Sequence, residues 1–123
     1  MKILVVDDSK VNLMIATVSM KSINAVIETA MSGDECIEMC KTVKYDIILL
    51  DQMMPGKDGV LTFKELKEDK EGLNYTTPVI MVTASDDVTE EDFIKEGMNG
   101  YLKKPFKADE IKHIIEKNCR EDD

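Results

Sequence analysis

Residues 47–59 read IILLDQMMPGKDG, a stretch that joins a strand-like run to an acidic loop. The run Ile47–Leu50 is apolar throughout, which is typical of a strand that is covered on both faces of a sheet. Asp51 follows this run directly, and the loop after it contains the turn-forming residues Pro55 and Gly56. We therefore expect Asp51 to lie at the carboxyl end of a central strand.

Outward from this stretch, strand-like runs alternate with segments of helical spacing. The other runs are Ile3–Val6, Ala25–Glu28, Val79–Val82 and Gly100–Leu102. A strict alternation of five strands and five helices predicts parallel strands, joined by right-handed crossovers, with helices on both faces of the sheet. The fold class is therefore α/β, and the functional crevice of such a sheet lies at the carboxyl ends of its strands.

The first helical segment follows Ser9, which is a suitable N-cap. Its apolar stripe is formed by residues three and four apart, namely Val11, Met14, Ile15 and Val18. This spacing predicts that the segment is a helix with one apolar stripe.

Three features of the other helical segments are interpreted as structural. The segment Thr89–Asp92 has the form of a capping box, and Gly97 is expected to end that helix. The charged run Lys64–Glu71 is interpreted as a solvated face. Cys36 and Cys40 lie one helical turn apart, and we expect both to pack in the core rather than to bind a metal.

Composition narrows the class of protein further. A chain of 123 residues fits one domain with one core, so we expect a single domain over residues 1–123. The formal charge of −9 argues against direct binding of nucleic acid by this domain. No apolar run exceeds four residues, so neither a membrane span nor a signal peptide is expected. Three cysteines are consistent with reduced thiols, which predicts a cytoplasmic location.

Chemically suggestive residues follow four of the five strands. They are Asp7 and Asp8 after the first, Asp51 after the third, Thr83 after the fourth and Lys104 after the fifth. If the first and third strands are neighbours, the three aspartates converge in one pocket, and Thr83 and Lys104 reach in from the other side.

Three clustered carboxylates need compensating charge, because two unit charges about 4 Å apart repel by roughly 4 kcal/mol at an effective dielectric near 20. A lysine and a divalent cation would balance them, and all-oxygen ligands favour Mg²⁺ or Mn²⁺. A cation beside a hydroxyl and an ammonium suits a transferring phosphoryl group. Asp51 is the best candidate for a nucleophile that forms an acyl phosphate.

Taken together, these strand-end motifs resemble the receiver domain of two-component response regulators, of the type found in chemotaxis regulators. The motifs are Asp7-Asp8, the run Asp51–Gly59, Thr83-Ala84 and Lys104-Pro105, and the resemblance covers essentially the whole chain. It implies a flavodoxin-like, doubly wound, five-stranded parallel sheet in the order 2-1-3-4-5, with five helices. It also implies a signalling domain that catalyses only its own phosphorylation and autodephosphorylation, rather than an enzyme.

The resemblance implies a role for each site residue. Asp51 would accept a phosphoryl group from a phosphohistidine on a histidine kinase or a histidine phosphotransfer protein. Asp8, Asp51 and the backbone carbonyl of Met53 would bind Mg²⁺ directly, and Asp7 would act mostly through metal-bound water. Phosphoryl oxygens would be bound by Thr83 and Lys104.

Other implied roles concern switching and the lifetime of the phosphate. Tyr101 matches the family's switch aromatic, which would move inward when Thr83 moves toward the phosphate and so alter the surface around the fourth helix, the fifth strand and the fifth helix. The Lys104-Pro105 peptide bond is expected to be cis. Met53 and Ser85 occupy positions that tune phosphate lifetime, and we expect Met53 to shield the acyl phosphate and give a slow to moderate lifetime.

Two alternatives use the same scaffold. A Mg²⁺-dependent aspartyl-phosphate phosphatase of the haloacid-dehalogenase type would have Asp-x-Asp after the first strand, where this chain has Asp7-Asp8-Ser9. A flavin or nucleotide binder would have a phosphate-binding loop there, whereas an acidic pair repels phosphate. No motif identifies the downstream protein target, or says whether the domain acts alone or within a hybrid kinase, a phosphorelay or a longer regulator.

Overall fold

A computed structural model describes residues 1–119 of the chain. Within these residues, five parallel strands form one sheet in the order β2-β1-β3-β4-β5, which confirms the predicted fold class and strand order. The strands are β1 (Lys2–Val6), β2 (Val26–Ala30), β3 (Ile47–Asp51), β4 (Val79–Thr83) and β5 (Gly100–Lys103). The helices are α1 (Lys10–Ser19), α2 (Gly33–Thr42), α3 (Gly59–Leu66), α4 (Glu90–Lys95) and α5 (Ala108–Asn118).

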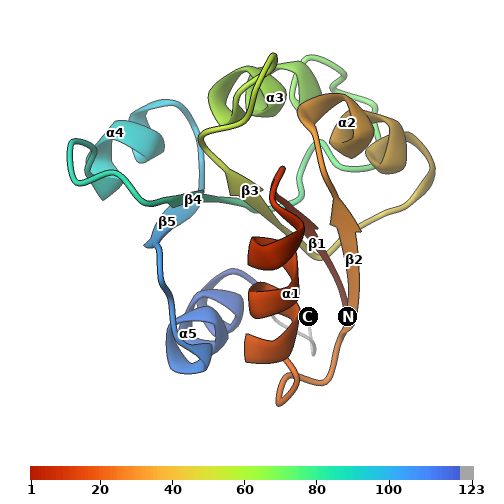
Figure 1. The fold of residues 1–123 in the computed structure, drawn as a ribbon. Helices are drawn as coiled ribbons and strands as arrows, with labels where there is room; N and C mark the ends of the chain where they lie inside the picture. The colour runs from red at the N-terminus through yellow and green to blue at the C-terminus, as the bar shows by residue number, and fades with distance from the viewer. Residues whose placement is uncertain (120–123) are drawn as a thin grey trace.

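The sheet lies between two layers of helices. Helices α1 and α5 cover one face, and α2, α3 and α4 cover the other (Figure 1). Successive residues of each inner strand alternate between the two layers, so that Ile3 and Val5 pack toward α1 and α5, whereas Leu4 and Val6 pack toward the opposite layer. Burial on both faces is the reason why the inner strands are uniformly apolar.

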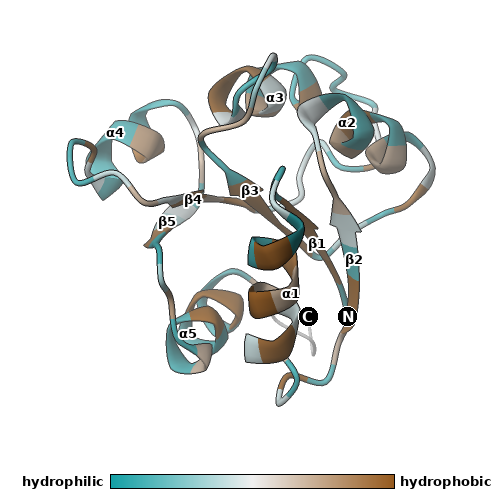
Figure 2. Ribbon diagram, in the orientation of Figure 1, coloured by the Kyte–Doolittle hydropathy of each residue, from teal (hydrophilic) through white to brown (hydrophobic). Residues whose placement is uncertain are grey.

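Helix α1 begins where the sequence predicts, because the Ser9 hydroxyl accepts a hydrogen bond from the backbone N–H of Asn12 at 3.2 Å. The apolar stripe that predicts the helix is not the face that packs against the sheet. Its members are largely exposed: Val11 (64%), Met14 (68%), Ile15 (56%) and Val18 (61%). The buried stripe consists of Leu13, Ala16 and Met20, which have the same helical spacing. Because α1 has apolar residues on two faces, periodicity alone does not decide which face meets the sheet; the apolar colouring along α1 is visible in Figure 2.

The charged segment after α3 is also not simply a solvated face. Lys67 is half-buried, and its ammonium donates hydrogen bonds to the backbone carbonyls of Asn74, Tyr75 and Thr77 at 3.0, 2.6 and 2.9 Å. The loop before β4 turns these carbonyls toward the end of α3, and a lysine supplies the donors that they need.

Other local predictions are confirmed with small shifts in boundary. The sequence predicts strand β2 at Ala25–Glu28, and the strand lies at Val26–Ala30. Cys36 and Cys40 are buried in the core, and the backbone N–H of Thr89 bonds to the Asp92 carboxylate at 2.7 Å, as a capping box requires. Among residues 1–119, no helix has both the length and the apolar character needed to cross a membrane.

Candidate functional site

Three aspartates meet at the carboxyl ends of β1 and β3. These strands are neighbours in the sheet, with Val6 opposite Leu50, so the residues that follow them lie side by side. Carboxylate oxygens of Asp7, Asp8 and Asp51 all lie within 4.8 Å of one another. Asp7 and Asp51 are buried, with exposures of 5% and 4%, whereas Asp8 is exposed to solvent.

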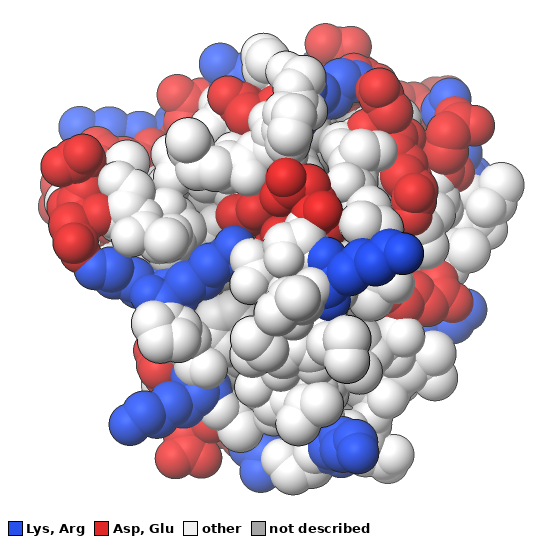
Figure 3. Space-filling model, viewed as in Figure 1, with Lys and Arg blue, Asp and Glu red and all other residues white. Residues whose placement is uncertain are grey.

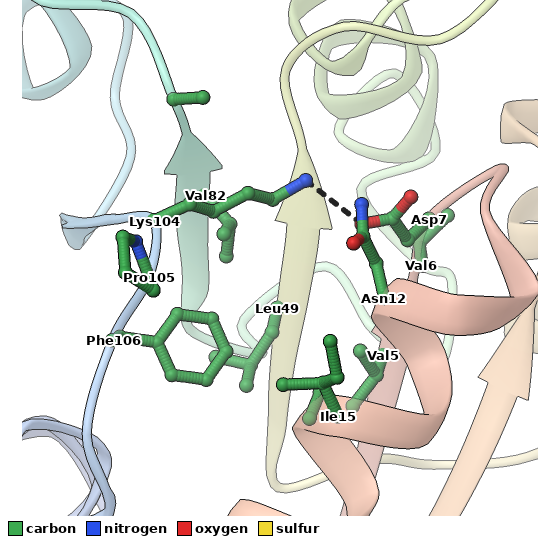
Figure 4. A pocket seen from close by; sticks show the side chains of 12 residues that line it. Val5, Val6, Asp7, Asn12, Ile15, Leu49, Val82, Lys104, Pro105 and Phe106 are labelled. Atoms are coloured by element: carbon green, nitrogen blue, oxygen red, sulfur yellow. Dashed lines mark hydrogen bonds and ion pairs between the residues drawn. The ribbon is translucent and has the colours of Figure 1, made fainter.

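Lys104 enters this cluster from the loop after β5. Its ammonium lies 2.8 Å from the Asp7 carboxylate, an ion pair visible in Figure 4. The same ammonium lies 3.2 Å from the carboxylate of Asp51, so one cation bridges the two buried carboxylates. Its backbone N–H donates to the carbonyl of Thr83 at 2.8 Å, which attaches the loop to the end of β4. The Lys104–Pro105 peptide bond is cis, as the resemblance implied.

Electrostatics of the cluster follow from its burial. Burial raises the pKa of the Asp51 carboxyl above its usual range, and the charge of Asp7 adds to this effect, whereas Lys104 opposes it. Burial acts to lower the pKa of Lys104, but its hydrogen bond to Asp7 and the charge of Asp51 outweigh burial and raise it overall. Lys104 is therefore protonated at neutral pH.

The donor set fits a hard divalent cation. With all three aspartates ionised and Lys104 protonated, the cluster carries two uncompensated negative charges, which is the charge that a divalent cation balances. All of the candidate ligand atoms of the aspartates are oxygens, and one of these residues is open to solvent. Mg²⁺ prefers oxygen ligands of this kind and usually keeps several waters.

Thr83 lies at the end of β4 and is fully buried. Its hydroxyl donates to the side-chain Oε1 of Gln52 at 2.6 Å and accepts from the backbone N–H of Ser85 at 3.0 Å. No sequence motif marks Gln52 as a partner of Thr83. The one available signal was its position, directly after Asp51 and at the edge of the cluster.

The remaining predicted residues surround the cluster without being part of it. Met53 follows in the loop after β3 and is 70% exposed. Ser85 is half-buried and contacts the Thr83 hydroxyl through its backbone. Tyr101 is half-buried on β5, where its ring packs against that of Phe93 with 5.9 Å between centroids. The lifetime and switching roles of these residues stay predictions.

An apolar surface borders the acidic cluster. A cavity of about 310 Å³ lies between α1 and the loop after β5, where Ile15 and Phe106 face it and Lys104 forms its rim (Figure 4). Figure 3 shows the acidic cluster in red at the centre of this side of the molecule, next to an uncharged surface over α1. That surface contains the exposed residues Val11, Met14, Ile15 and Val18.

Comparison with known proteins agrees with this geometry. The chain is 35% identical over 126 residues to the osmosensing histidine protein kinase SLN1 of Saccharomyces cerevisiae, a match that covers 96% of the chain and 10% of that protein. It is 36% identical over 111 residues to the transcriptional regulatory protein ResD of Bacillus subtilis, which covers 89% of the chain and 44% of ResD. The chain therefore spans less than half the length of either relative.

A solved structure of similar fold contains a metal ion. The receiver domain of the sensor histidine kinase PA1611 from Pseudomonas aeruginosa PAO1 superimposes with a TM-score of 0.84 at 27% identity, covering 95% of each chain, and holds a magnesium ion in its active-site cleft. The family model of the response regulator receiver domain matches residues 3–116. The strand order and the acidic cluster agree with this match, and the chain belongs to the response regulator receiver domain family.

Proposed function

We propose that this domain is a phosphorylatable switch, in which Asp51 accepts a phosphoryl group from a phosphohistidine on a histidine kinase or a histidine phosphotransfer protein. The observation that carries the proposal is the bridging position of Lys104 between the buried carboxylates of Asp7 and Asp51. A buried carboxylate with a cation fixed beside it combines a nucleophile with a group that stabilises phosphoryl oxygens.

The reaction forms one bond and breaks another at phosphorus. An Asp51 oxygen bonds to phosphorus while the bond from phosphorus to the donor imidazole nitrogen breaks, and the electron pair of that bond stays with the imidazole. The Lys104 ammonium lies 3.2 Å from the Asp51 carboxylate, so it is placed to bind a phosphoryl oxygen on that residue. Most of the catalysis is therefore positioning and charge stabilisation.

We assign a magnesium or manganese ion to the acidic cluster. Asp8, Asp51 and the backbone carbonyl of Met53 would bind it directly, and Asp7 would act mainly through metal-bound water. The ion supplies positive charge to the oxygens of the phosphoryl group. The two uncompensated negative charges of the cluster support this assignment.

The apolar surface over α1 is the proposed docking site for the histidine-bearing partner. Helix α1 begins directly after the Asp7-Asp8 pair, so a protein seated on its exposed face is within reach of Asp51. The neighbouring cavity beside Lys104 offers an apolar recess of about 310 Å³ for a side chain of that partner. An interface with an apolar centre and charged surroundings is the usual form for protein partners.

We assign the signalling output of the domain and the lifetime of its acyl phosphate to residues around the acidic cluster. Thr83 and Tyr101 would link the phosphorylation state to the surface formed by α4, β5 and α5, by shifting the population of two conformations. Met53 and Ser85 would tune the lifetime of the acyl phosphate. The three free thiols of the chain are compatible with the reducing cytoplasm, where we propose that the domain works.

One incubation separates this proposal from its enzymatic rival. The protein is mixed with acetyl phosphate with and without Mg²⁺, and its intact mass is measured together with the release of inorganic phosphate from a small phosphomonoester. We expect the mass of one phosphoryl group per chain, dependent on Mg²⁺ and absent from Asp51→Asn, with no turnover of the phosphomonoester. Multiple turnover of the phosphomonoester by the wild type but not by Asp51→Asn would instead identify an aspartyl-phosphate phosphatase.

A further inference from the structure

The Thr83 hydroxyl is engaged away from Asp51 in this structure. It donates to Oε1 of Gln52 at 2.6 Å, which is a short hydrogen bond, while its oxygen accepts from the N–H of Ser85 at 3.0 Å. Thr83 is fully buried, so water does not offer this hydroxyl an alternative partner. Both sides of the hydroxyl are therefore satisfied by residues on the chain itself.

We propose that Gln52 is a latch that holds the Thr83 hydroxyl in its resting position and opposes the phosphorylated state. This inference rests on the proposed function, in which Thr83 binds a phosphoryl oxygen on Asp51. A hydroxyl has a single proton, so Thr83 cannot donate at full strength to both Gln52 and a phosphoryl oxygen. Capture of the phosphate by Thr83 therefore requires the bond to Gln52 to break.

The backbone keeps Gln52 in place for this task. Its N–H donates to the carbonyl of Val82 on β4 at 2.9 Å, and its carbonyl accepts from the N–H of Gly59 at the start of α3, also at 2.9 Å. Gly59 is packed so closely that an added Cβ would lie 2.5 Å from the Asp51 carbonyl oxygen and 2.9 Å from the Cα of Gln52. Gln52 is thus fixed by β4 and α3, and its side chain reaches Thr83 from a rigid position.

The expected energies make the latch weak enough to open. A hydrogen bond to an ionised acceptor such as a phosphoryl oxygen is roughly twice as strong as a neutral hydrogen bond. Phosphorylation therefore overcomes the latch, but the latch lowers the population of the activated conformation in its absence. Gln52 acts through Thr83, so it is a positioning residue rather than a catalytic one.

The test uses beryllofluoride, which mimics a phosphoryl group on a carboxylate, at a fixed Mg²⁺ concentration. The half-saturating beryllofluoride concentration is measured by NMR titration for the wild type, Gln52→Met, Thr83→Val and the double variant. Methionine has a similar length but lacks the acceptor oxygen. Urea unfolding of each free protein is measured in parallel.

We expect Gln52→Met to bind beryllofluoride about two- to tenfold more tightly than the wild type, because the competing acceptor is gone. In the Thr83→Val background, the same substitution should have no effect, since there is no hydroxyl to release. A residue with a merely structural role would lower both stability and affinity, so an increase in affinity is specific to the latch.

Two results would overturn the latch. One is an affinity of Gln52→Met that is equal to or below that of the wild type, and the other is the same gain in affinity with and without the Thr83 hydroxyl. Failure of the proposed function has a different signature: the wild type and Asp51→Asn would both show no Mg²⁺-dependent binding of beryllofluoride, whatever residue stands at position 52.

Discussion

The ammonium of Lys104 lies 3.2 Å from the carboxylate of Asp51, although 53 positions separate the two residues in the chain. The same ammonium also lies 2.8 Å from Asp7, so a single side chain compensates carboxylates from two strands. The fold thus places a cation where two buried anions meet, and the stability of the resting domain is linked to its chemistry.

Removing that cation should destabilise the protein. Lys104→Met leaves Asp7 and Asp51 without their partner, and we expect a loss of about 1–3 kcal/mol in the free energy of unfolding, below the value for fully buried pairs because the lysine is partly exposed. Lys103→Met is the matched control and should change stability by less than about 0.5 kcal/mol. Among the residues that the structure describes, the ion-pair partner of Lys103 is the exposed Asp86. Equal losses in urea unfolding of the two variants would refute the bridge.

The ionised Asp51 carboxylate should itself cost stability when no metal is added. Its pKa is raised in the folded protein, so protons bind more tightly to the folded state than to the unfolded state, and stability falls as pH rises through that pKa. In EDTA near pH 7, Asp51→Asn should therefore have a higher free energy of unfolding than the wild type. The advantage should disappear as pH is lowered below the raised pKa, where Asp51 is neutral.

Urea unfolding at several pH values measures this difference, with the exposed Asp87→Asn as a control for the loss of a carboxylate. An asparagine variant that is less stable than the wild type at pH 7, or a difference that stays constant with pH, would contradict the assigned burial of charge.

Much of this site could be predicted from the sequence because parallel α/β topology brings strand ends together. The uniformly apolar runs identify the inner strands, and Asp7, Asp51 and Lys104 follow strands that the topology makes neighbours or near neighbours. The local sequence thus predicts where a residue lies relative to the end of a strand. The residues that come into contact there are nevertheless far apart in the chain.

Other features could not be predicted from the sequence because they depend on how distant segments pack together. Helix α1 has two apolar stripes, and only packing shows that Leu13 is buried and Ile15 exposed. Lys67 bonds to three carbonyls whose direction is set by the loop before β4. The contact between Gln52 and Thr83 joins two side chains 31 positions apart, and no periodicity or motif marks it.

The exposed stripe of α1 should matter for the partner but not for the chemistry. Ile15→Glu places a charge at the centre of the proposed docking site, and we expect phosphotransfer from a phosphorylated histidine phosphotransfer protein to fall about tenfold or more. Phosphorylation by acetyl phosphate should be unchanged, because this small donor does not need the surface.

Ile94→Glu is the matched control for that experiment. Ile94 is exposed on α4 to a similar degree, 49% against 56% for Ile15, and lies on the other layer of helices. Equal effects of the two substitutions on protein-to-protein transfer, or a loss of acetyl phosphate reactivity in Ile15→Glu, would remove α1 as the docking surface.

Met53 should control how long the acyl phosphate lasts. Its side chain is exposed two residues after Asp51 and has no group that positions water, so Met53→Glu should speed autodephosphorylation by about tenfold. Met14→Glu is the control, because Met14 is equally exposed, at 68% against 70%, but lies on α1. The rates are measured as the decay of the phosphorylated fraction of each protein in a buffer without EDTA. An unchanged rate in Met53→Glu would reject the shielding role.

The central claim is that Asp51 carries the phosphoryl group, and locating the modified residue tests it most directly. The protein is phosphorylated with acetyl phosphate and Mg²⁺, the acyl phosphate is reduced with borohydride, and the peptides are sequenced by tandem mass spectrometry. We expect reduction to convert Asp51 alone, and we expect Asp51→Asn to give no reduced residue. Modification at Asp7, Asp8 or any other residue, with Asp51 intact, would contradict it.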